Sequence, residues 1–359
     1  MTGQLSDKRG FRGFSGASIA LLSALLFGVT TPLAKTFLED SNPLLIAGLL
    51  YLGSGVGLSV WRVLQDKGWK PMGLERPDYT WLAIATIAGG VVAPALLMFG
   101  LSRSDAATSS LFLNLEVVFS AVLAWVVFHE ATGKRVVLGF LAIFAGSVLL
   151  AWPAHGVVPG RSTGLLCICG ACFFWGIDNN VTRKISAGDS RAIAAIKGVV
   201  AGSTNTILAI ALGAELPGLR DVTAALVLGF LGYGVSLVLF IVSLRHLGTA
   251  RTGAYFSTAP FIGSALSVAL FGLPVTPALY VAGLLMAIGV WLHVTEQHEH
   301  EHLHEPLTHS HSHVHDAHHR HDHEAGLDTL EPHAHEHSHV PLRHSHPHFP
   351  DIHHQHQHR

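Results

Sequence analysis

Ten long apolar stretches constrain what this chain can fold into. A membrane-spanning helix needs roughly 20 mostly apolar residues, and ten stretches of about that length follow one another here: residues 15–36, 43–62, 79–101, 106–128, 134–153, 163–182, 192–213, 222–244, 250–271 and 276–294. Backbone polar groups cannot stay unpaired in lipid, so these segments must be helices or strands of a closed barrel. Alternating strand patterns are absent, which excludes the barrel. The sequence predicts an all-α membrane protein with ten transmembrane helices.

Lys and Arg are distributed unevenly between the two sets of connections. One set holds two to four each, starting with Lys8, Arg9 and Arg12 before the first stretch, whereas the other set holds about one each. Positively charged loops face the cytoplasm. This asymmetry predicts a multi-pass protein of the cell's inner (plasma) membrane with both termini, including the N-terminal residues 1–14, in the cytoplasm.

The apolar region contains two similar halves, residues 15–153 and 163–294. "FGVTTPLAK" (27–35) in the first stretch aligns with "WGIDNNVTR" (175–183) in the sixth. The segment 105–130 aligns with 247–274, which places Glu116 opposite Pro260. Because each half has an odd number of helices, the second half enters the membrane upside down, an arrangement typical of secondary transporters.

These motifs resemble the EamA type of the drug/metabolite transporter superfamily. The resemblance is carried by "LFGVTTPLAK", by "VVFHEATGKRVVLGFLAIFAGSVLL" (126–150) and by "STAPFIGSALSVALFGLPVT" (257–276), and it covers roughly residues 15–294. It implies a ten-helix fold that exchanges solutes by alternating access. The chain departs from the family where Glu116 stands at a position that is commonly Pro, and where Pro274 stands at one that is commonly acidic.

Glu116 lies near the middle of the fourth stretch, where a charged group costs roughly 2.5–3.5 kcal/mol on insertion scales. Its functional interpretation is a carboxylate that exchanges a proton or cation, or that contacts substrate directly. The alternative is a structural acid bonded to a neighbouring helix. The sequence favours the functional interpretation.

Asp178, Asn179 and Asn180 follow one another in the sixth stretch. At 100° per residue they cannot all face one cavity, so either the helix unwinds or some of them bond to adjacent helices. Asp178 either guards the inner mouth of a pathway or pairs with Arg183 or Lys184 at the interface.

Four further residues are candidates for the substrate pathway. Pro32 removes a backbone hydrogen bond and opens a polar spot beside Thr30 and Thr31. Lys35 contacts an anionic group or, as is more common at a helix end, extends to the interface. Trp175 stacks on a ligand or packs in the core.

The C-terminal residues 295–359 differ completely from the rest, because they hold 23 of the 27 His residues. A segment so polar and so poor in aromatics cannot bury a core, so it is predicted to be disordered. Imidazoles at alternate positions can bind Zn²⁺, Ni²⁺ or Co²⁺; the alternative is a solvated, pH-responsive segment. The candidate ligands are His298, His300, His302, His304, His309, His311, His313, His315, His318, His319, His321, His323, His333, His335, His337 and His339.

Three functions remain open at this point. The first is a secondary exporter of a small metabolite with a cytosolic metal-binding tail, the second is a transporter of the metal itself, and the third is a membrane-tethered metal store or sensor. An enzyme is disfavoured because neither an H-E-x-x-H pattern nor a nucleophile elbow occurs, and nucleic acid is excluded as a partner by the lack of a basic patch. No cofactor is required, and the sequence leaves a homodimer open.

Overall fold

The computed structural model describes residues 16–66, 73–128, 133–152, 160–185, 188–295, 298–304, 308–313, 333–338 and 342–348. Backbone contacts divide the chain into a helical body, Gly13–Glu296, and a second unit made of Met1–Arg12 and Gln297–Arg359. The two units are described separately.

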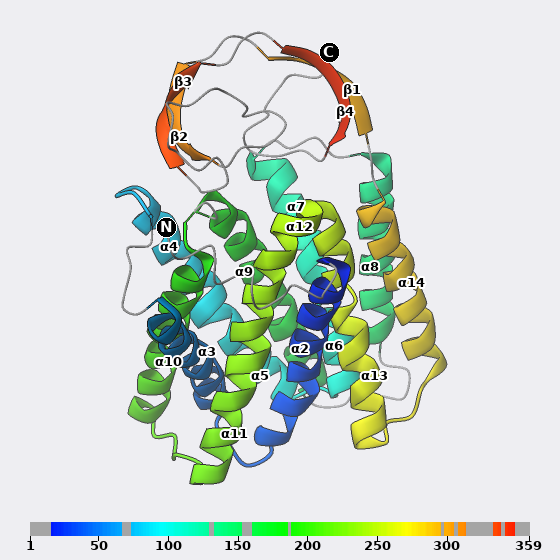
Figure 1. Cartoon of the computed structure of the whole chain (residues 1–359). Coiled ribbons are helices and arrows are strands. Elements are labelled where there is room, and N and C mark those ends of the chain that lie inside the picture. Colours follow the sequence, from blue (N-terminus) through cyan, green and yellow to red (C-terminus); the bar gives the residue numbers. More distant parts are fainter. Residues whose placement is uncertain are drawn as a thin grey trace. The chain divides into compact units, whose positions relative to one another are not determined.

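The body is entirely helical, and most predicted spans correspond to one helix or to two helices in line (Figure 1). The first half contains α2 (Gly16–Phe37), α3 (Pro43–Asp66), α4 (Asp78–Ala85), η1 (Thr86–Val92), α5 (Ala93–Ser102), α6 (Ala106–Phe112), α7 (Leu115–Phe128) and α8 (Lys134–Ala151). The second half contains α9 (Arg161–Lys184), α10 (Ser190–Ala211), α11 (Leu219–Gly229), η2 (Phe230–Val235), α12 (Ser236–Phe256), α13 (Ala259–Phe271) and α14 (Pro277–Val294).

The prediction of an all-helical membrane protein is confirmed. Among the described residues, eight continuous helical segments are long and apolar enough to cross a membrane, and two shorter apolar helices, Ala259–Phe271 and Pro277–Leu292, follow them. One boundary differs from the prediction, because α12 includes the expected connection at 245–249 and the interruption falls at Ser257–Thr258 instead.

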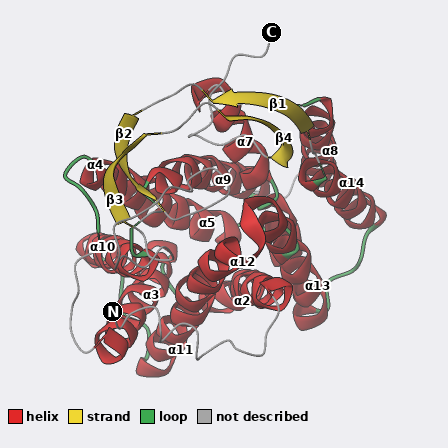
Figure 2. Cartoon of the chain, turned by 45° about the horizontal axis from the view of Figure 1, so that its top comes forward, coloured by secondary structure: helices red, strands yellow, loops and turns green. Residues whose placement is uncertain are grey.

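The two halves pack against each other along the whole body. Helix α3 pairs with α10 and α8 pairs with α14, each joining equivalent helices of the two halves. Helix α2 contacts α12 and α13, just as α9 contacts α5 and α7. Figure 2 shows α8 beside α14 at one edge of the body and α3 beside α10 at another. Each half therefore depends on the other for burial of its helices.

Two irregularities recur at equivalent places in the halves. The π-helix η1 joins α4 to α5, and the π-helix η2 joins α11 to α12. The fourth span is interrupted at Leu113–Asn114 and its counterpart at Ser257–Thr258. As a result, Glu116 and Pro260 are each the second residue of the helix that follows, which agrees with the predicted alignment.

Glycine lets these helices approach until their backbones touch. A Cβ atom on Gly53 of α3 would overlap the backbone of Leu226 in α11, and one on Gly229 would overlap the backbone of Leu50. Small residues at such crossings are the usual basis of helix association in lipid, where no hydrophobic force draws helices together.

The second unit contains four short strands in two antiparallel pairs. β1 (His298–His304) pairs with β4 (Leu342–His348), and β2 (Thr308–His313) pairs with β3 (His333–Ser338). The sequence analysis did not predict these strands. Their side chains, and the whole of His315, His318, His319, His321, His323 and His339, lie outside the described residues.

Replacement of Gly229 by Ala is expected to lower the free energy of unfolding by roughly 1–3 kcal/mol, because the added methyl group forces α3 and α11 apart. Thermal unfolding of the detergent-solubilised protein measures this. Gly253→Ala is the matched control, since nothing lies within 4 Å of a Cβ atom there. Equal effects of the two substitutions would contradict the role of close packing.

Candidate functional site

The consecutive polar residues of α9 bond to two neighbouring helices, α10 and α7. The helix runs without interruption from Arg161 to Lys184, so it does not unwind at these residues. Asp178 bonds to α10, Asn179 bonds to α7, and Asn180 bonds to the backbone carbonyls of Ser120 and Gly176 at 2.9 and 2.8 Å. Of the two predicted arrangements, bonding to adjacent helices is therefore the correct one.

Asp178 belongs to a buried ion pair. The Lys197 Nζ atom of α10 donates to Asp178 Oδ1 at 2.5 Å, and the Thr182 hydroxyl donates to the same oxygen at 2.7 Å. The carboxylate also packs against Gly89 of η1, where a Cβ atom would overlap it. Asp178 thus joins α9 to both α10 and η1.

The ion pair that the structure describes for Asp178 is with Lys197, and no described contact joins Asp178 to Lys184. The Lys184 Nζ atom lies 4.1 Å from the centre of the Trp81 ring, an exposed cation–π contact. The Arg183 side chain lies outside the described residues. A lysine on the neighbouring helix supplies the counter-charge because Asp178 faces α10.

Glu116 and Asn179 connect the two halves at a second point. The Asn179 Nδ2 atom donates to Glu116 Oε1 at 2.8 Å and to the Ser120 hydroxyl at 3.2 Å. Glu116 lies in the first turn of α7, where the helix dipole favours a carboxylate. Gly176 permits this contact, because a Cβ atom at position 176 would lie only 3.0 Å from the Cβ atom of Phe119.

The two acidic residues differ in their electrostatic partners and in their exposure. The charge of Asp178 is offset by Lys197, whereas the partner of Glu116 is the neutral amide of Asn179. Asp178 is buried, but Glu116 is partly exposed and Asn179 is exposed. An ionised Glu116 therefore lacks a counter-ion among the described residues, and its described partner is a neutral amide.

Trp175 is buried in an aromatic cluster that spans the two halves, so the structure places it in the core. Its ring contacts Phe27 at 6.4 Å between centroids, Phe27 contacts Tyr233 at 5.8 Å, and Tyr233 contacts Tyr51 at 5.1 Å. Trp175 Nε1 and the Tyr51 hydroxyl both donate to the carbonyl of Gly89, at 3.1 and 2.8 Å. Phe27, Tyr51, Trp175 and Tyr233 are called the aromatic cluster below.

Thr30 and Thr31 are buried in α2. The Thr30 hydroxyl donates to the Leu26 carbonyl at 2.8 Å, and Thr30 packs against Gly232 of η2, where a Cβ atom would overlap its hydroxyl oxygen. This contact between the halves is the pseudo-symmetric counterpart of the contact between Asp178 and Gly89.

Lys35 is placed apart from the acidic residues. Its Nζ atom donates to the carbonyls of Leu101 and Ser104, at 2.6 and 3.1 Å. These carbonyls lie at the C-terminal end of α5, where the helix dipole favours a cation. The structure thus gives Lys35 a capping position that the sequence analysis did not anticipate.

Sequence analysis missed Lys197, Tyr51 and Ser120. Lys197 had a clear signal, since a lysine inside an apolar stretch needs a partner in lipid. Tyr51 and Ser120 gave no such signal in the sequence. The role of Tyr51 depends on the carbonyl of Gly89 in η1, and the role of Ser120 depends on the approach of α9 to α7.

The arrangement is that of a helical membrane transporter, with two similar halves and polar groups at their interface. The family model of the EamA-like transporter family matches residues 14–152 and 162–295. The chain therefore belongs to the EamA-like transporter family, and it is a transporter and not an enzyme.

Individual relatives agree with this assignment. An "Uncharacterized transporter" of Methanothermobacter thermautotrophicus is 27% identical over 291 residues, which cover 76% of this chain and 84% of that protein. A "probable 4-amino-4-deoxy-L-arabinose-phosphoundecaprenol flippase subunit" of Pseudomonas aeruginosa is 32% identical over 115 residues, 31% of this chain and 96% of that protein. A solved structure described only as "Crystal structure of protein" has a TM-score of 0.60 at 18% identity, covers 78% of this chain and 99% of its own, and shows the fold alone.

Replacement of Lys197 by Met is expected to destabilise the protein by roughly 3–5 kcal/mol, because it leaves the charge of Asp178 buried without a partner. The double variant Asp178→Asn/Lys197→Met removes both charges and is expected to recover much of this loss. Unfolding in detergent micelles measures both. Lys134→Met is the control and should cost about 0.5 kcal/mol or less, since Lys134 is exposed at the start of α8. A double variant as unstable as Lys197→Met would contradict the ion-pair interpretation.

Proposed function

We propose that the protein is a secondary active exporter of a small organic metabolite and works by alternating access. The observation that carries this proposal is the contact between Glu116 of α7 and Asn179 of α9, a carboxylate and an amide from different halves, at 2.8 Å. Rearrangement of one half against the other must change this contact. Repeats of this kind expose a central site first to one side of the membrane and then to the other.

Glu116 is proposed as the group that couples transport to a gradient. A carboxylate in lipid is stable when it is protonated or when a cation lies beside it. Its described partner is an amide, so a proton and a cationic group of the substrate compete for the same oxygen atoms. This competition links the movement of the substrate to the movement of a proton in the opposite direction.

An organic substrate is supported by the likeness to the probable flippase subunit of Pseudomonas aeruginosa, whose name gives 4-amino-4-deoxy-L-arabinose-phosphoundecaprenol. The aromatic cluster joins the halves, because the Trp175 and Tyr51 donors both bond to the carbonyl of Gly89. The orientation proposed here, with both termini in the cytoplasm, is supported by the distribution of Lys and Arg along the chain.

Replacement of Glu116 by Gln is expected to abolish transport driven by a pH gradient, because an amide cannot exchange a proton. Gln has nearly the same shape, and its oxygen can still accept from Asn179, so the fold is expected to persist. The measurement uses inverted membrane vesicles with an imposed pH gradient and a mixture of small metabolites, whose uptake is followed by mass spectrometry.

The control for this experiment is Glu215→Gln, a substitution at an exposed acid outside the helices. It should leave uptake as in the wild type. Gradient-driven uptake that persists in a folded Glu116→Gln protein would contradict the proposed role of this carboxylate.

We further propose that the His-rich tail binds Zn²⁺, Ni²⁺ or Co²⁺. Besides the composition, the strand register supports this proposal. In the first strand pair His298, His300 and His302 stand opposite His348, His346 and His344, and the second pair matches His with His at three further positions. Imidazoles on directly opposite residues are close enough to share a metal ion.

This tail supports a second candidate function, in which the metal itself is the substrate and the tail collects it. A membrane-tethered metal store without transport is less well supported, because an anchor needs neither the Glu116–Asn179 contact nor the buried ion pair of Asp178 and Lys197.

Truncation after Val294 distinguishes the regulatory tail from the collecting tail. If the tail only regulates an exporter of metabolites, the truncated protein loses high-affinity Zn²⁺ or Ni²⁺ binding, measured by calorimetry, but still takes up metabolites in vesicles. If metal is the substrate, uptake of radioactive Zn²⁺ or Ni²⁺ in the same vesicles falls as well. Unchanged metal binding after truncation would contradict both roles of the tail.

A further inference from the structure

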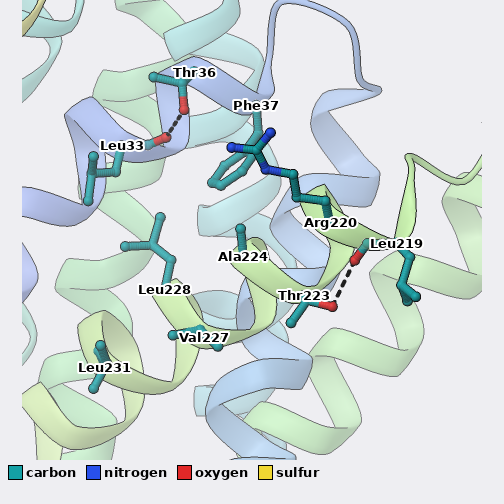
Figure 3. A pocket seen from close by; sticks show the side chains of 10 residues that line it. All are labelled: Leu33, Thr36, Phe37, Leu219, Arg220, Thr223, Ala224, Val227, Leu228 and Leu231. Carbon is teal, nitrogen blue, oxygen red and sulfur yellow. Dashed lines mark hydrogen bonds between the residues drawn. The ribbon is translucent and has the colours of Figure 1, made fainter.

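A groove of about 800 Å³ opens between one end of α2 and the first turns of α11 (Figure 3). Its walls are apolar and include Leu33, Phe37, Val227 and Leu228. The hydroxyl groups that line it, on Thr36 and Thr223, each donate to a backbone carbonyl of their own helix at 2.7 Å. The groove therefore offers a molecule little hydrogen bonding along its length.

One cation lines the groove, and it lies at the end of a span. Arg220 is exposed and is the second residue of α11. No carboxylate among the described residues forms an ion pair with it. The helix dipole disfavours a cation in the first turn of a helix and favours an anion there. An anion beside Arg220 is therefore stabilised by the guanidinium charge and also by the dipole.

The depth of the groove matches the boundary between lipid headgroups and acyl chains. Phe37 ends one apolar span, and Leu219 begins another. Ends of spans lie at the level of the headgroups. An occupant held here has its charged group beside Arg220 and its apolar part between the helices.

The pseudo-symmetric place, between α9 and α4, is filled by the protein itself. There Leu82 of α4 packs against Ile185, next to the end of α9, and Trp81 covers them beneath Lys184. The match of Gly89 with Gly232 also places Trp81 opposite Ala224, which lines the groove. The small side chain of Ala224 leaves open the space that an indole ring fills at the pseudo-symmetric place.

We infer that this groove is a lipid-binding site that holds one acyl chain of an anionic phospholipid, with the phosphate group on Arg220. A guanidinium group binds phosphate through two parallel hydrogen bonds. Apolar walls bind the acyl chain by the burial of its methylene groups. This inference does not depend on the proposed export function, because none of the residues that line the groove belongs to the Glu116–Asn179 contact or to the aromatic cluster.

Native mass spectrometry of the full-length protein in dodecyl maltoside, titrated with dioleoylphosphatidylglycerol, tests the inference. The wild-type protein is expected to bind one molecule more tightly than the others and to prefer it over dioleoylphosphatidylcholine, whose headgroup carries its own cation. Arg220→Gln is expected to weaken the tightest site by about tenfold, since it removes a charge-assisted hydrogen bond. Ala224→Trp is expected to abolish that site by filling the groove while Arg220 stays in place.

Arg103→Gln is the matched control. Arg103 directly follows α5, and the C-terminal end of α5 is capped by Lys35 from the end of α2. Arg103 and the groove therefore lie at the same end of the body. The Arg103 guanidinium lies over the Phe99 ring and does not line the groove. It should leave the affinity for phosphatidylglycerol unchanged. The inference is overturned if folded Arg220→Gln binds this lipid like the wild type, if Arg103→Gln weakens binding equally, or if phosphatidylcholine binds the wild type as tightly. Arg220 is exposed, so its variant is expected to keep the unfolding temperature of the wild type.

Discussion

A charged or polar group inside a membrane must find a partner within the protein, and this constraint organises the centre of the molecule. Helix α9 illustrates it most clearly. Its acid is directed to α10 and the two amides that follow are directed to α7, so the helix carries all three without unwinding. The same constraint explains why Lys197 faces Asp178 and why Lys35 bonds to carbonyls at the end of α5. These bonds fix which helices are adjacent, and the glycine contacts then fix how closely they approach.

The equivalence of the two halves extends to individual contacts, but the chemistry of those contacts has diverged. On one side of the pseudo-symmetry an acid of α9 packs on a glycine of η1, and on the other side a threonine of α2 packs on a glycine of η2, so both contacts join the two halves. Glu116 and Pro260 occupy matching places after matching interruptions. The two sets of contacts thus share their geometry, but the titratable residues Asp178 and Glu116 occur in only one of the two sets. A transporter built in this way can change its substrate by exchanging a few side chains without changing its framework.

Much of this arrangement could be predicted from the sequence, and the remainder shows where prediction fails. The periodicity of α9 was sufficient to predict that Asp178, Asn179 and Asn180 face different directions, and the internal alignment was sufficient to pair Glu116 with Pro260. Lys197 was missed although a lysine in an apolar stretch is a visible signal. The π-helices could not be predicted, because a wider turn depends on which neighbouring groups donate to the carbonyl that it releases. Tyr51 and Trp175 acquire their shared acceptor only from that turn.

The matching π-helices mark where both halves widen. A π-turn accommodates one residue more than the α-helix around it, and such turns frequently mark functional sites. Here both occur at the same place in the third helix of each half. Each contains a glycine, Gly89 or Gly232, that lies against a polar side chain of the opposite half. The widened turns therefore lie where polar side chains reach from one half to the other.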